Sequence, residues 1–416
     1  MTHELSTARR RTYGMVSALL VVLMISGCKR GSGEIPELSK RSSYSKIFQQ
    51  FDRAEAKSDP LERCLSYPSP PHLQWPESLT SALCADLHTP VMQASDIKPL
   101  IDKGDWKALH DRYAGYLERH YSGEDAEKLL YRVFPESSWK NPKEADSYTR
   151  KWVDAQPEDP FANTARGTFL MSAAWDARGT GYFKEVPDAK KREMYRHALE
   201  ATVHLRKAIA AEPKLMPAYR KLIDAYALGG KSEWIPAAVR AATRQSPGTY
   251  YVRSMAANFM QRKWGGSDHD MDALIADAER HVKQNPRLAM IRIDRERELG
   301  DAALDKKKHR SALAQYRRAL SHGPDNTALL NAAYVAPKLG YHAEKIVYLT
   351  QDIRFSKDGR DSLMSRGAIW ESDGDFRRAM NDYRAAKKLY PLDAKIDERI
   401  AAAKEREKKY GDRKRP

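Results

Sequence analysis

The sequence of 416 residues has only three cysteines, no apolar run long enough to cross a bilayer and no recognisable catalytic motif. Its most apolar stretch, Met15 to Ile25, has 11 residues, whereas a membrane-spanning helix needs about 20. No histidine pair has the i, i+4 spacing of a helical zinc site, and no serine, cysteine or aspartate stands in a nucleophile motif. We therefore predict a protein that is not an enzyme and that holds no metal or other cofactor.

Two partial motifs resemble ligand sites without completing them. Gly230-Lys231-Ser232 ends like a phosphate-binding loop, but Ala225 stands where the first glycine belongs, and a helical pattern precedes it instead of a strand. Asp268-His269-Asp270 is the densest group of ligand-type residues, yet it lies at a predicted helix start, where the helix dipole favours acids. Neither motif therefore changes the prediction of a protein that is not an enzyme and holds no metal or other cofactor.

The first 28 residues have the pattern of an export signal. Arg9 to Arg11 precede the apolar run, and the ending Ile25-Ser26-Gly27-Cys28 follows it. This ending resembles the lipobox of bacterial lipoproteins, which implies cleavage before Cys28 and acylation of that residue. In that family Lys29, in place of aspartate, implies the outer membrane. We expect a lipid-anchored protein facing the periplasm; the alternative is an uncleaved membrane helix with an unrelated cysteine.

Basic residues exceed acidic residues by 72 to 56, a net charge of +16. Removal of residues 1–27 takes away three arginines and Glu4, which leaves +14. The basic residues are interleaved with acidic ones along the chain, and only the tail at residues 401–416 is locally dense. Two interpretations stay open: a solvated basic surface, or attraction to an acidic protein or envelope polymer. The predicted export disfavours nucleic acid as a partner.

Cys64 and Cys84 remain once Cys28 is assigned to lipid attachment. An even pair of cysteines in an oxidising compartment is typical of a disulfide. The loop between them is rich in proline and would gain from the cross-link. We favour a Cys64–Cys84 bridge over two buried thiols.

The stretch Asp361 to Pro391 has the spacing of a helical hairpin. Gly367 and Ala379 are small enough for two helices to approach closely, and Gly374 suits the turn between them. These three residues, together with Trp370, Tyr383, Ala386 and Pro391, have the spacing of the tetratricopeptide repeat, which the stretch therefore resembles. Five of the positions recur 67 residues earlier, about twice the usual period of 34, as Gly300, Ala312, Tyr316, Ala319 and Pro324.

A degenerate copy is therefore expected between the two clear ones. It has a turn at Gly340, although Pro337 in its first helix departs from the repeat pattern. Earlier second helices end before Pro213 and Pro247. A single hairpin cannot bury its own apolar face, so several must stack. We predict an all-α, tetratricopeptide-like helical-hairpin solenoid behind a cleaved lipoprotein signal peptide.

A second set of motifs lies between residues 96 and 285. Its members, in order, are Lys103-Gly104-Asp105, Trp152-Val153, Ala165-Arg166-Gly167, Trp175-x-x-Arg178-Gly179-x-Gly181-Tyr182 and Trp264-Gly265-Gly266-Ser267. This order resembles the bacterial domain-of-unknown-function 4034 family. The resemblance implies an all-helical, repeat-like domain and no established activity. From the residues themselves, Ser267 is expected to cap a helix, with Asp270 at its third position.

These patterns divide the chain into six parts. They are a signal peptide at 1–27, a membrane tether at 28–60, a proline-rich segment with the cysteine pair at 61–95, the 4034-like helical domain at 96–285, the tetratricopeptide-like repeats at 286–400 and the basic tail at 401–416.

The repeat resemblance also implies a groove lined by first-helix positions. Those positions are Arg220, Asp224, Arg297, Asp301, Asp305, Met364 and Glu371. Their mixed charge favours a polar segment of a protein partner; the alternative is an ordinary solvated helix face. The leading hypothesis is a scaffold for protein–protein interaction, either an envelope or secretion adaptor or an immunity protein against a secreted toxin. The alternatives are a binder of peptidoglycan or lipopolysaccharide and, more remotely, a wall-active enzyme.

Overall fold

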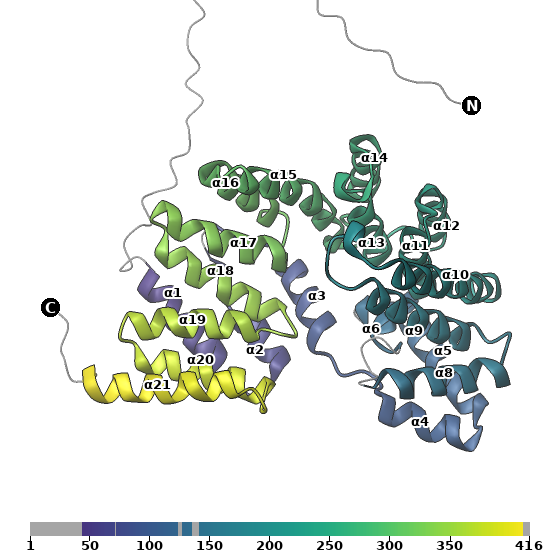
Figure 1. The fold of residues 1–416 in the computed structure, drawn as a ribbon, viewed down its shortest axis with the longest axis horizontal. Helices are drawn as coiled ribbons and strands as arrows, with labels where there is room; N and C mark the ends of the chain where they lie inside the picture. Colours follow the sequence, from purple (N-terminus) through teal and green to yellow (C-terminus); the bar gives the residue numbers. More distant parts are fainter. Residues whose placement is uncertain (1–43, 71, 124–126, 135–140, 411–416) are drawn as a thin grey trace, which may run out of the picture. The chain divides into compact units, whose positions relative to one another are not determined.

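The computed structural model describes residues 44–70, 72–123, 127–134 and 141–410 (Figure 1), all within one compact unit, Leu38–Pro416. Regular structure in these ranges is entirely helical, as predicted. Within them, no helix is both long and apolar enough to cross a membrane. The predicted signal peptide, Cys28 and residues 411–416 of the predicted tail lie outside the described residues.

Most of the chain is in helices joined by short turns. The α-helices are α1 Ser45–Glu55, α2 Pro60–Ser66, α3 Glu77–His88, α4 Ala94–Lys103, α5 Trp106–Ser122, α6 Lys128–Arg132, α8 Pro142–Ala155, α9 Pro160–Arg178, α10 Asp188–Ala211, α11 Met216–Leu228, α12 Ile235–Gln245, α13 Tyr250–Met260, α14 Asp268–Glu279, α15 Ile293–Asp305, α16 His309–Leu320, α17 Asn326–Val335, α18 His342–Phe355, α19 Arg360–Ser372, α20 Phe376–Leu389 and α21 Ala394–Tyr410. The short 3₁₀ helices are η2 Phe183–Glu185, η3 Ser232–Trp234, η4 Arg262–Trp264, η5 Pro286–Arg292 and η6 Ala336–Leu339.

The two clear repeats form helical hairpins, α15–α16 and α19–α20, that use the same close contact. A Cβ added to Gly300 would lie 2.6 Å from the ring of Tyr316, and one added to Gly367 would lie 2.6 Å from the ring of Tyr383. Both tyrosines are fully buried. Glycine is therefore required where each pair of helices crosses, which confirms the physical basis of the predicted spacing.

The degenerate repeat is the hairpin α17–α18. Proline has no backbone N–H to donate in a helix interior. Accordingly α17 ends at Val335, and Pro337 lies in the short 3₁₀ helix η6. Gly340 then makes the turn with a φ of 87°, in the left-handed region that favours glycine. The departure noted in the sequence thus shortens the first helix of this hairpin.

Another hairpin, α9–α10, lies in the part that precedes the clear repeats (Figure 1). Gly167 of α9 faces Leu205 of α10, and an added Cβ would meet the Leu205 side chain at 2.6 Å. A run of buried small residues on α10, which includes Ala198 and Ala201, extends the same close packing. The residues of the predicted Ala165-Arg166-Gly167 motif therefore serve helix contact.

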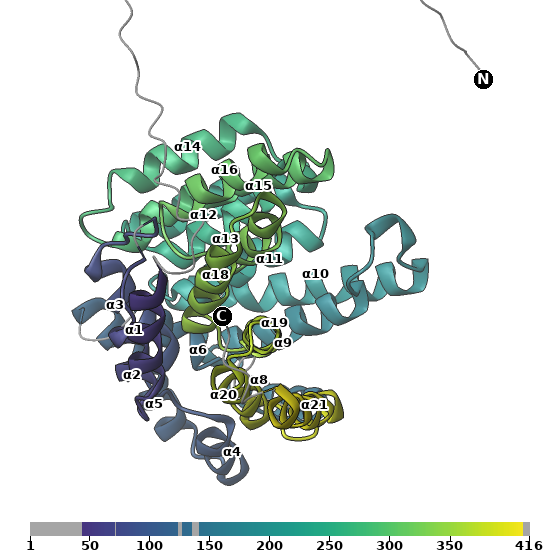
Figure 2. The ribbon, with the colours of Figure 1, turned by 90° about the vertical axis from the view of Figure 1, so that its left-hand side faces the viewer.

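The first helices belong to the folded body, which corrects the predicted tether at 28–60. α1 buries Phe48 and Phe51, and Phe48 packs edge-on against Trp370 of α19 with ring centroids 5.3 Å apart. The apolar face of an amphipathic helix must be covered, and the C-terminal hairpins cover this one (Figures 1 and 2). The residues left for a tether, 28–43, lie outside the described ranges.

Two large hydrophobic cores, beside a small cluster of Leu363, Ala386 and Ile396, divide the described residues in a way that the sequence does not predict. The first joins buried side chains between Val91 and Ile291. The second joins residues 44–84 with residues 290–403, so the predicted proline-rich segment is not separate from the repeats. Trp75, for example, donates its indole N–H to the carbonyl of Leu320 at 2.6 Å. The N-terminal helices thus cover the C-terminal hairpins.

Candidate functional site

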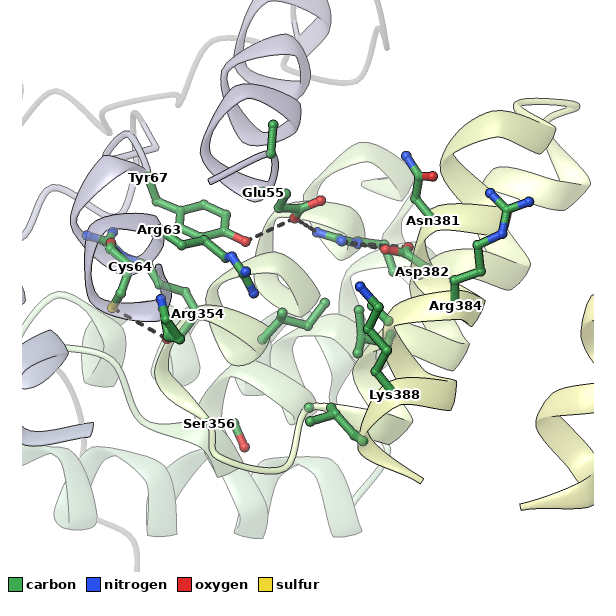
Figure 3. A pocket seen from close by; sticks show the side chains of 18 of the residues that line it. Glu55, Arg63, Cys64, Tyr67, Arg354, Ser356, Asn381, Asp382, Arg384 and Lys388 are labelled. Carbon is green, nitrogen blue, oxygen red and sulfur yellow. Dashed lines mark hydrogen bonds and ion pairs between the residues drawn. The ribbon is translucent and has the colours of Figure 1, made fainter. Parts of the chain in front are cut away.

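A cleft of about 810 Å³ lies between the N-terminal helices and the last hairpins (Figure 3). Helices α1 and α2 and Tyr67 form one wall. The end of α18, the loop that follows it, α19 and α20 form the other. The cleft is therefore built from segments at opposite ends of the chain, which the second core holds together. We call it the basic cleft, because of the charged side chains described below.

Local sequence features position the α2 wall. Asp59 caps α2 by accepting the Glu62 N–H at 2.7 Å, and Pro60 occupies the first turn of the helix. Cys64 forms a disulfide with Cys84, which ties α2 to α3. Arg63 is oriented by its bonds to the backbone carbonyls of Lys57 (2.9 Å) and Ser58 (3.2 Å). The short helix is thus held at its start, along its side and at its basic residue.

A buried charge network joins the two walls at the base of the cleft. Arg366 of α19 donates two parallel hydrogen bonds to Asp382 of α20, at 3.0 and 2.6 Å, and a third to Glu55 of α1 at 2.7 Å. The Tyr67 hydroxyl donates to the same Glu55 oxygen at 3.0 Å. A paired geometry of this kind between arginine and carboxylate is both strong and directional. It sets the position of α1 relative to α19 and α20.

Burial affects the two main partners of this network in different ways. Burial raises the pKa of Asp382 to about 6, although Arg366 acts in the opposite direction. Burial also opposes the charge on Arg366, but the Asp382 and Glu55 carboxylates more than compensate and raise its pKa well above the usual value. Arg366 is therefore permanently charged, and its charge is already used inside the protein.

The third acidic residue that lines the cleft is also paired. Asp52 accepts hydrogen bonds from Arg377 at 3.1 Å and from Arg378 at 2.8 Å. Burial alone would raise the pKa of Asp52, but the bonds from the two guanidinium groups dominate and lower it. Asp52, Glu55 and Asp382 thus all have arginine partners, and no acid of the lining is left to neutralise another cation.

Five further cations line the cleft without a carboxylate partner among the described residues. They are Arg63, Arg354, Lys357, Arg384 and Lys388. Arg384 and Lys388 are one helical turn apart on α20. Figure 3 shows Arg63 and Lys388 extending into the opening from opposite sides. Because nothing in the lining balances them, these side chains give the cleft a positive potential.

Arg354 is the most enclosed of these cations. It donates to the Cys64 carbonyl at 2.8 Å, and its guanidinium lies 4.6 Å from the ring centroid of Phe355. Burial lowers the pKa of Arg354 to about 10, so the group is still protonated at neutral pH. Burial lowers the pKa of Lys357 as well, and the nearby positive charge of Arg132 adds to this effect. An anion in the cleft would relieve this concentration of charge.

The remaining lining is partly apolar. Ile353, Leu363, Ala385 and Leu389 contribute hydrocarbon surface between the charged side chains. Among the described residues there is no group of three or more histidine, cysteine, aspartate or glutamate side chains arranged to hold a metal ion. The arrangement suits an anionic ligand that also carries apolar groups.

The predicted groove residues do not line the basic cleft. Arg220 and Arg297 do share a separate pocket of about 270 Å³, which Asp294 and Asp325 also line. Arg297 forms ion pairs with both of these acids, and its contact with Asp325 is 3.2 Å. Asp224 is buried and accepts the indole N–H of Trp175 at 2.9 Å. Arg297 and Asp224 therefore bond to neighbouring helices of the fold.

The other predicted groove residues are similarly dispersed. Asp301 accepts the Tyr316 hydroxyl and Glu371 accepts the Tyr383 hydroxyl, each at 2.8 Å, within their own hairpins. Met364 is partly buried against the second core, and Asp305 is exposed. The repeat template assigns the predicted groove positions to a free surface. In this structure, several of these side chains instead join neighbouring helices through hydrogen bonds or ion pairs. The signal that could have found the cleft is the pair Arg384 and Lys388, which lacks acidic neighbours at helical spacing.

Comparison with known families covers the middle of the chain. Residues 93–246 match the family model described as Domain of unknown function (DUF4034). The match is shorter than the resemblance expected from the motifs, which extends to residue 285, and it excludes every residue that lines the basic cleft. No curated protein matches the sequence.

The sequence motifs that resemble this family have structural roles here. Trp175 packs edge-on against Trp264, with ring centroids 6.3 Å apart, and bonds to Asp224. Arg178 donates to the carbonyls of Gly179 and Gly181 and so closes the loop after α9. Ser267 caps α14 by accepting the Asp270 N–H at 3.1 Å, as predicted. These motif residues hold helices and loops in place.

Two solved structures are similar in a general way. "Crystal structure of APC/C hetero-tetramer Cut9-Hcn1" has 14% identity and a TM-score of 0.33, covering 86% of this chain and 66% of that chain. "Crystal Structure of P58(IPK) TPR Domain at 2.5 A" has 15% identity and a TM-score of 0.27, covering 76% of this chain and 97% of that chain. The present chain thus spans slightly less than two thirds of the first structure.

Proposed function

We propose that the protein is a helical-repeat scaffold that binds an acidic segment of a partner protein in the basic cleft. The observation that carries this proposal is the set of five lining cations without a carboxylate partner among the described residues. Stacked helical hairpins present side chains from several helices to one ligand, which is how repeat proteins build extended binding surfaces. On this proposal the protein binds and is not an enzyme.

The cleft suits a peptide segment better than a small anion. Its cations stand on α2, at the end of α18, on the loop after α18 and on α20, so one phosphate or sulfate would reach only some of them. Apolar side chains such as Leu363 and Leu389 separate the charges. A chain that alternates acidic and apolar residues satisfies both kinds of surface, with charge guiding encounter and apolar burial adding affinity.

The location and biological use are part of the proposal. The basic start, the short apolar run and the Ile25–Cys28 ending support a protein anchored by lipid at Cys28 to the bacterial outer membrane and facing the periplasm. A scaffold in that place would serve either as an envelope or secretion adaptor or as an immunity protein against a secreted toxin. The identity of the captured partner separates these two uses.

The same cations favour one second candidate, an acidic envelope polymer. Peptidoglycan and lipopolysaccharide carry carboxylates or phosphates that would satisfy Arg63, Arg384 and Lys388. Such a ligand lacks the regular apolar side chains that the remaining lining would accept. We therefore favour the protein segment and keep the polymer as an outcome of the test.

The test compares two double charge reversals in the full chain. Arg384→Glu/Lys388→Glu alters the cleft, and Lys404→Glu/Lys408→Glu makes the same change at the same spacing on the exposed face of α21. The probe is a fluorescent peptide of alternating glutamate and leucine. We expect the cleft variant to weaken binding roughly tenfold or more, and the α21 variant to change it by less than about threefold.

Crosslinking in intact cells then identifies the natural ligand. One protein that is captured by the wild type and by the α21 variant, and lost from the cleft variant, supports the proposal. Equal peptide binding by both variants would overturn the cleft as the site. Recovery of wall or lipopolysaccharide material alone would assign the cleft to a polymer, and turnover of purified wall polymer would overturn the proposal of a non-enzyme.

A further inference from the structure

The outward face of α10 carries exposed apolar side chains in a regular row. Met194, Ala198 and Leu205 point into the first core. On the opposite side Tyr195, Leu199 and Val203 follow one another at four-residue intervals, and Leu199 and Val203 are 53% and 57% exposed. Residues four apart are neighbours on a helix surface. Single exposed apolar residues are ordinary, but a row of them is a patch.

Exposed aromatic residues extend the row at both ends. Near its start, Phe183 lies beside Lys191, with the ammonium 5.3 Å from the ring centroid, and the adjacent Tyr182 is 75% exposed. Near its end, Arg206 lies 5.5 Å from the ring centroid of the exposed Trp234. From Lys191 to Arg206 the helix rises about 22 Å. We call the apolar members the α10 strip: Tyr182, Phe183, Tyr195, Leu199, Val203 and Trp234.

Positive charge accompanies the strip. No carboxylate lies within ion-pair distance of Lys184, Arg192 or Arg206 among the described residues. Two of the acids on α10 are already engaged: Asp188 pairs with Lys191 at 3.4 Å, and Glu200 contacts Arg166 at 3.4 Å. Glu185 in η2 and Glu233 in η3 lie beside the ends of the strip. The strip is therefore aromatic at both ends, aliphatic in its centre and flanked by cations that lack acidic partners.

We propose that the α10 strip lies on the surface of an anionic lipid bilayer. Tyrosine and tryptophan favour the boundary between headgroups and acyl chains, because one end of each side chain is apolar and the other is polar. Lysine and arginine beside such an apolar face add attraction to anionic headgroups. Figure 2 shows the α9–α10 hairpin at the right-hand side of the ribbon, with α10 running toward that edge.

Other occupants fit less well. A symmetric contact with a second copy would place Lys184, Arg192 and Arg206 of both copies in one interface, although none of them has an ion-pair partner in its own copy among the described residues. A stable protein interface buries about 1,200–2,000 Å² around a water-excluding centre. The centre of the strip is the outward side of α10, and its ends lie at η2 and η3. A bilayer can cover such a surface without a complementary groove. This inference does not depend on the function proposed for the basic cleft, since the two sites share no residue.

The test places a fluorophore on the strip in the full chain. Residues 15–25 could themselves bind vesicles, so the readout must report on the strip. Cys28→Ser removes the one cysteine outside the disulfide, and Tyr182→Cys then accepts an environment-sensitive dye. Vesicles are pure phosphatidylcholine or phosphatidylcholine with phosphatidylglycerol, and both carry lipid-linked nitroxide quencher. A second protein carries the dye at Tyr334→Cys, an exposed position on α17.

We expect the dye at position 182 to be quenched by the anionic vesicles, less in high salt, and the dye at position 334 to be unaffected. Leu199→Glu/Val203→Glu should weaken the response at position 182 roughly tenfold or more. Leu330→Glu/Tyr334→Glu, an exposed pair with the same spacing on α17, should leave it unchanged. Circular dichroism of each variant confirms that it is folded.

Three outcomes would overturn the proposal. No quenching at position 182 by anionic vesicles excludes lipid contact there. Equal quenching at positions 182 and 334 shows that the strip has no special role. A response to an acidic amphipathic helical peptide, without a response to vesicles, would assign the strip to a protein partner instead.

Discussion

Asp86 and Arg287 are 201 residues apart in the sequence, yet the Arg287 Nε donates to the Asp86 Oδ2 at 2.6 Å inside the protein. The Tyr251 hydroxyl donates to the same oxygen at 2.6 Å, and the backbone N–H of Lys128 donates to the other carboxylate oxygen at 2.9 Å. The contact joins α3, which packs with the C-terminal hairpins, to η5, α13 and α6. One buried carboxylate thus ties the two cores together.

Asp86→Ala should destabilise the protein strongly. It leaves the Arg287 charge buried without its partner, and such a loss typically costs about 3–5 kcal/mol. Asp111, which pairs with Lys107 at the surface, is the control, because an exposed ion pair contributes about 0–1 kcal/mol. Denaturant titration of both alanine variants measures the difference. Similar midpoints for the two variants would contradict the central role assigned to Asp86.

Gly367→Ala should destabilise the last hairpin. The new methyl would lie 2.6 Å from the buried Tyr383 ring, and overpacking of this kind typically costs about 1–3 kcal/mol. Gly115→Ala in α5 is the control, since nothing would lie within 4 Å of the added Cβ and alanine there should stabilise by about 0.5–1 kcal/mol. Thermal unfolding of the two variants should shift in opposite directions. Shifts of the same sign would show that the close contact is absent.

The stability of the wild type should rise with pH above about 8 because of Lys128. Burial lowers the pKa of this lysine from 10.5 to about 8. Between these values the unfolded chain binds a proton that the folded chain does not, so stability increases with pH, at most by about 1.4 kcal/mol per pH unit. Denaturation midpoints between pH 8 and 9.5 measure this slope, below the range in which tyrosines ionise.

Two substitutions separate titration at Lys128 from packing. Lys128→Met cannot ionise, and Lys128→Arg stays charged in both states, so each should lose this contribution to the slope. The two variants differ in charge but share the expected loss. A slope that persists unchanged in both would mean that another group is responsible.

Loss of the Cys64–Cys84 disulfide should weaken the α2 wall of the cleft. The bridge closes a loop with a sequence separation of 20, for which the chain-entropy model gives a contribution of about 3 kcal/mol. Cys64→Ser/Cys84→Ser should therefore unfold at lower denaturant, and reductant should lower the midpoint of the wild type only. Mass analysis without reductant should find one linked peptide. Free thiols at both positions in the folded protein would contradict the bridge.

The helical hairpins could be predicted because their determinants are local. Gly300 and Gly367 stand at fixed distances from Tyr316 and Tyr383, and the same steric contact recurs in each pair. Pro337 likewise ends a helix through its own missing N–H. Such rules connect residues of a single helix or of one helical hairpin, so spacing alone reveals them.

Several of the predicted groove residues bond within the fold for a related reason. A repeat template says which side of a helix a residue occupies but not which polar groups lie opposite it. Arg297 and Asp224 occupy template positions, yet both bond to residues of the fold. The assignment of 28–60 to a tether failed because the partner of α1's apolar face, Trp370, lies more than 300 residues along the chain.

The helical class, the hairpin turns and the caps follow from the sequence alone, because each depends on a few residues of one helix or hairpin. The places where charge accumulates follow from the packing of segments that are far apart in the chain. Arg63 and Lys388 face one cleft because α1 and α2 pack against the last hairpins. The acids Asp52, Glu55 and Asp382 do not neutralise them, because each forms an ion pair with another arginine. Whether a cation has an acidic partner depends on long-range packing, which cannot be predicted from the spacing of residues in the sequence.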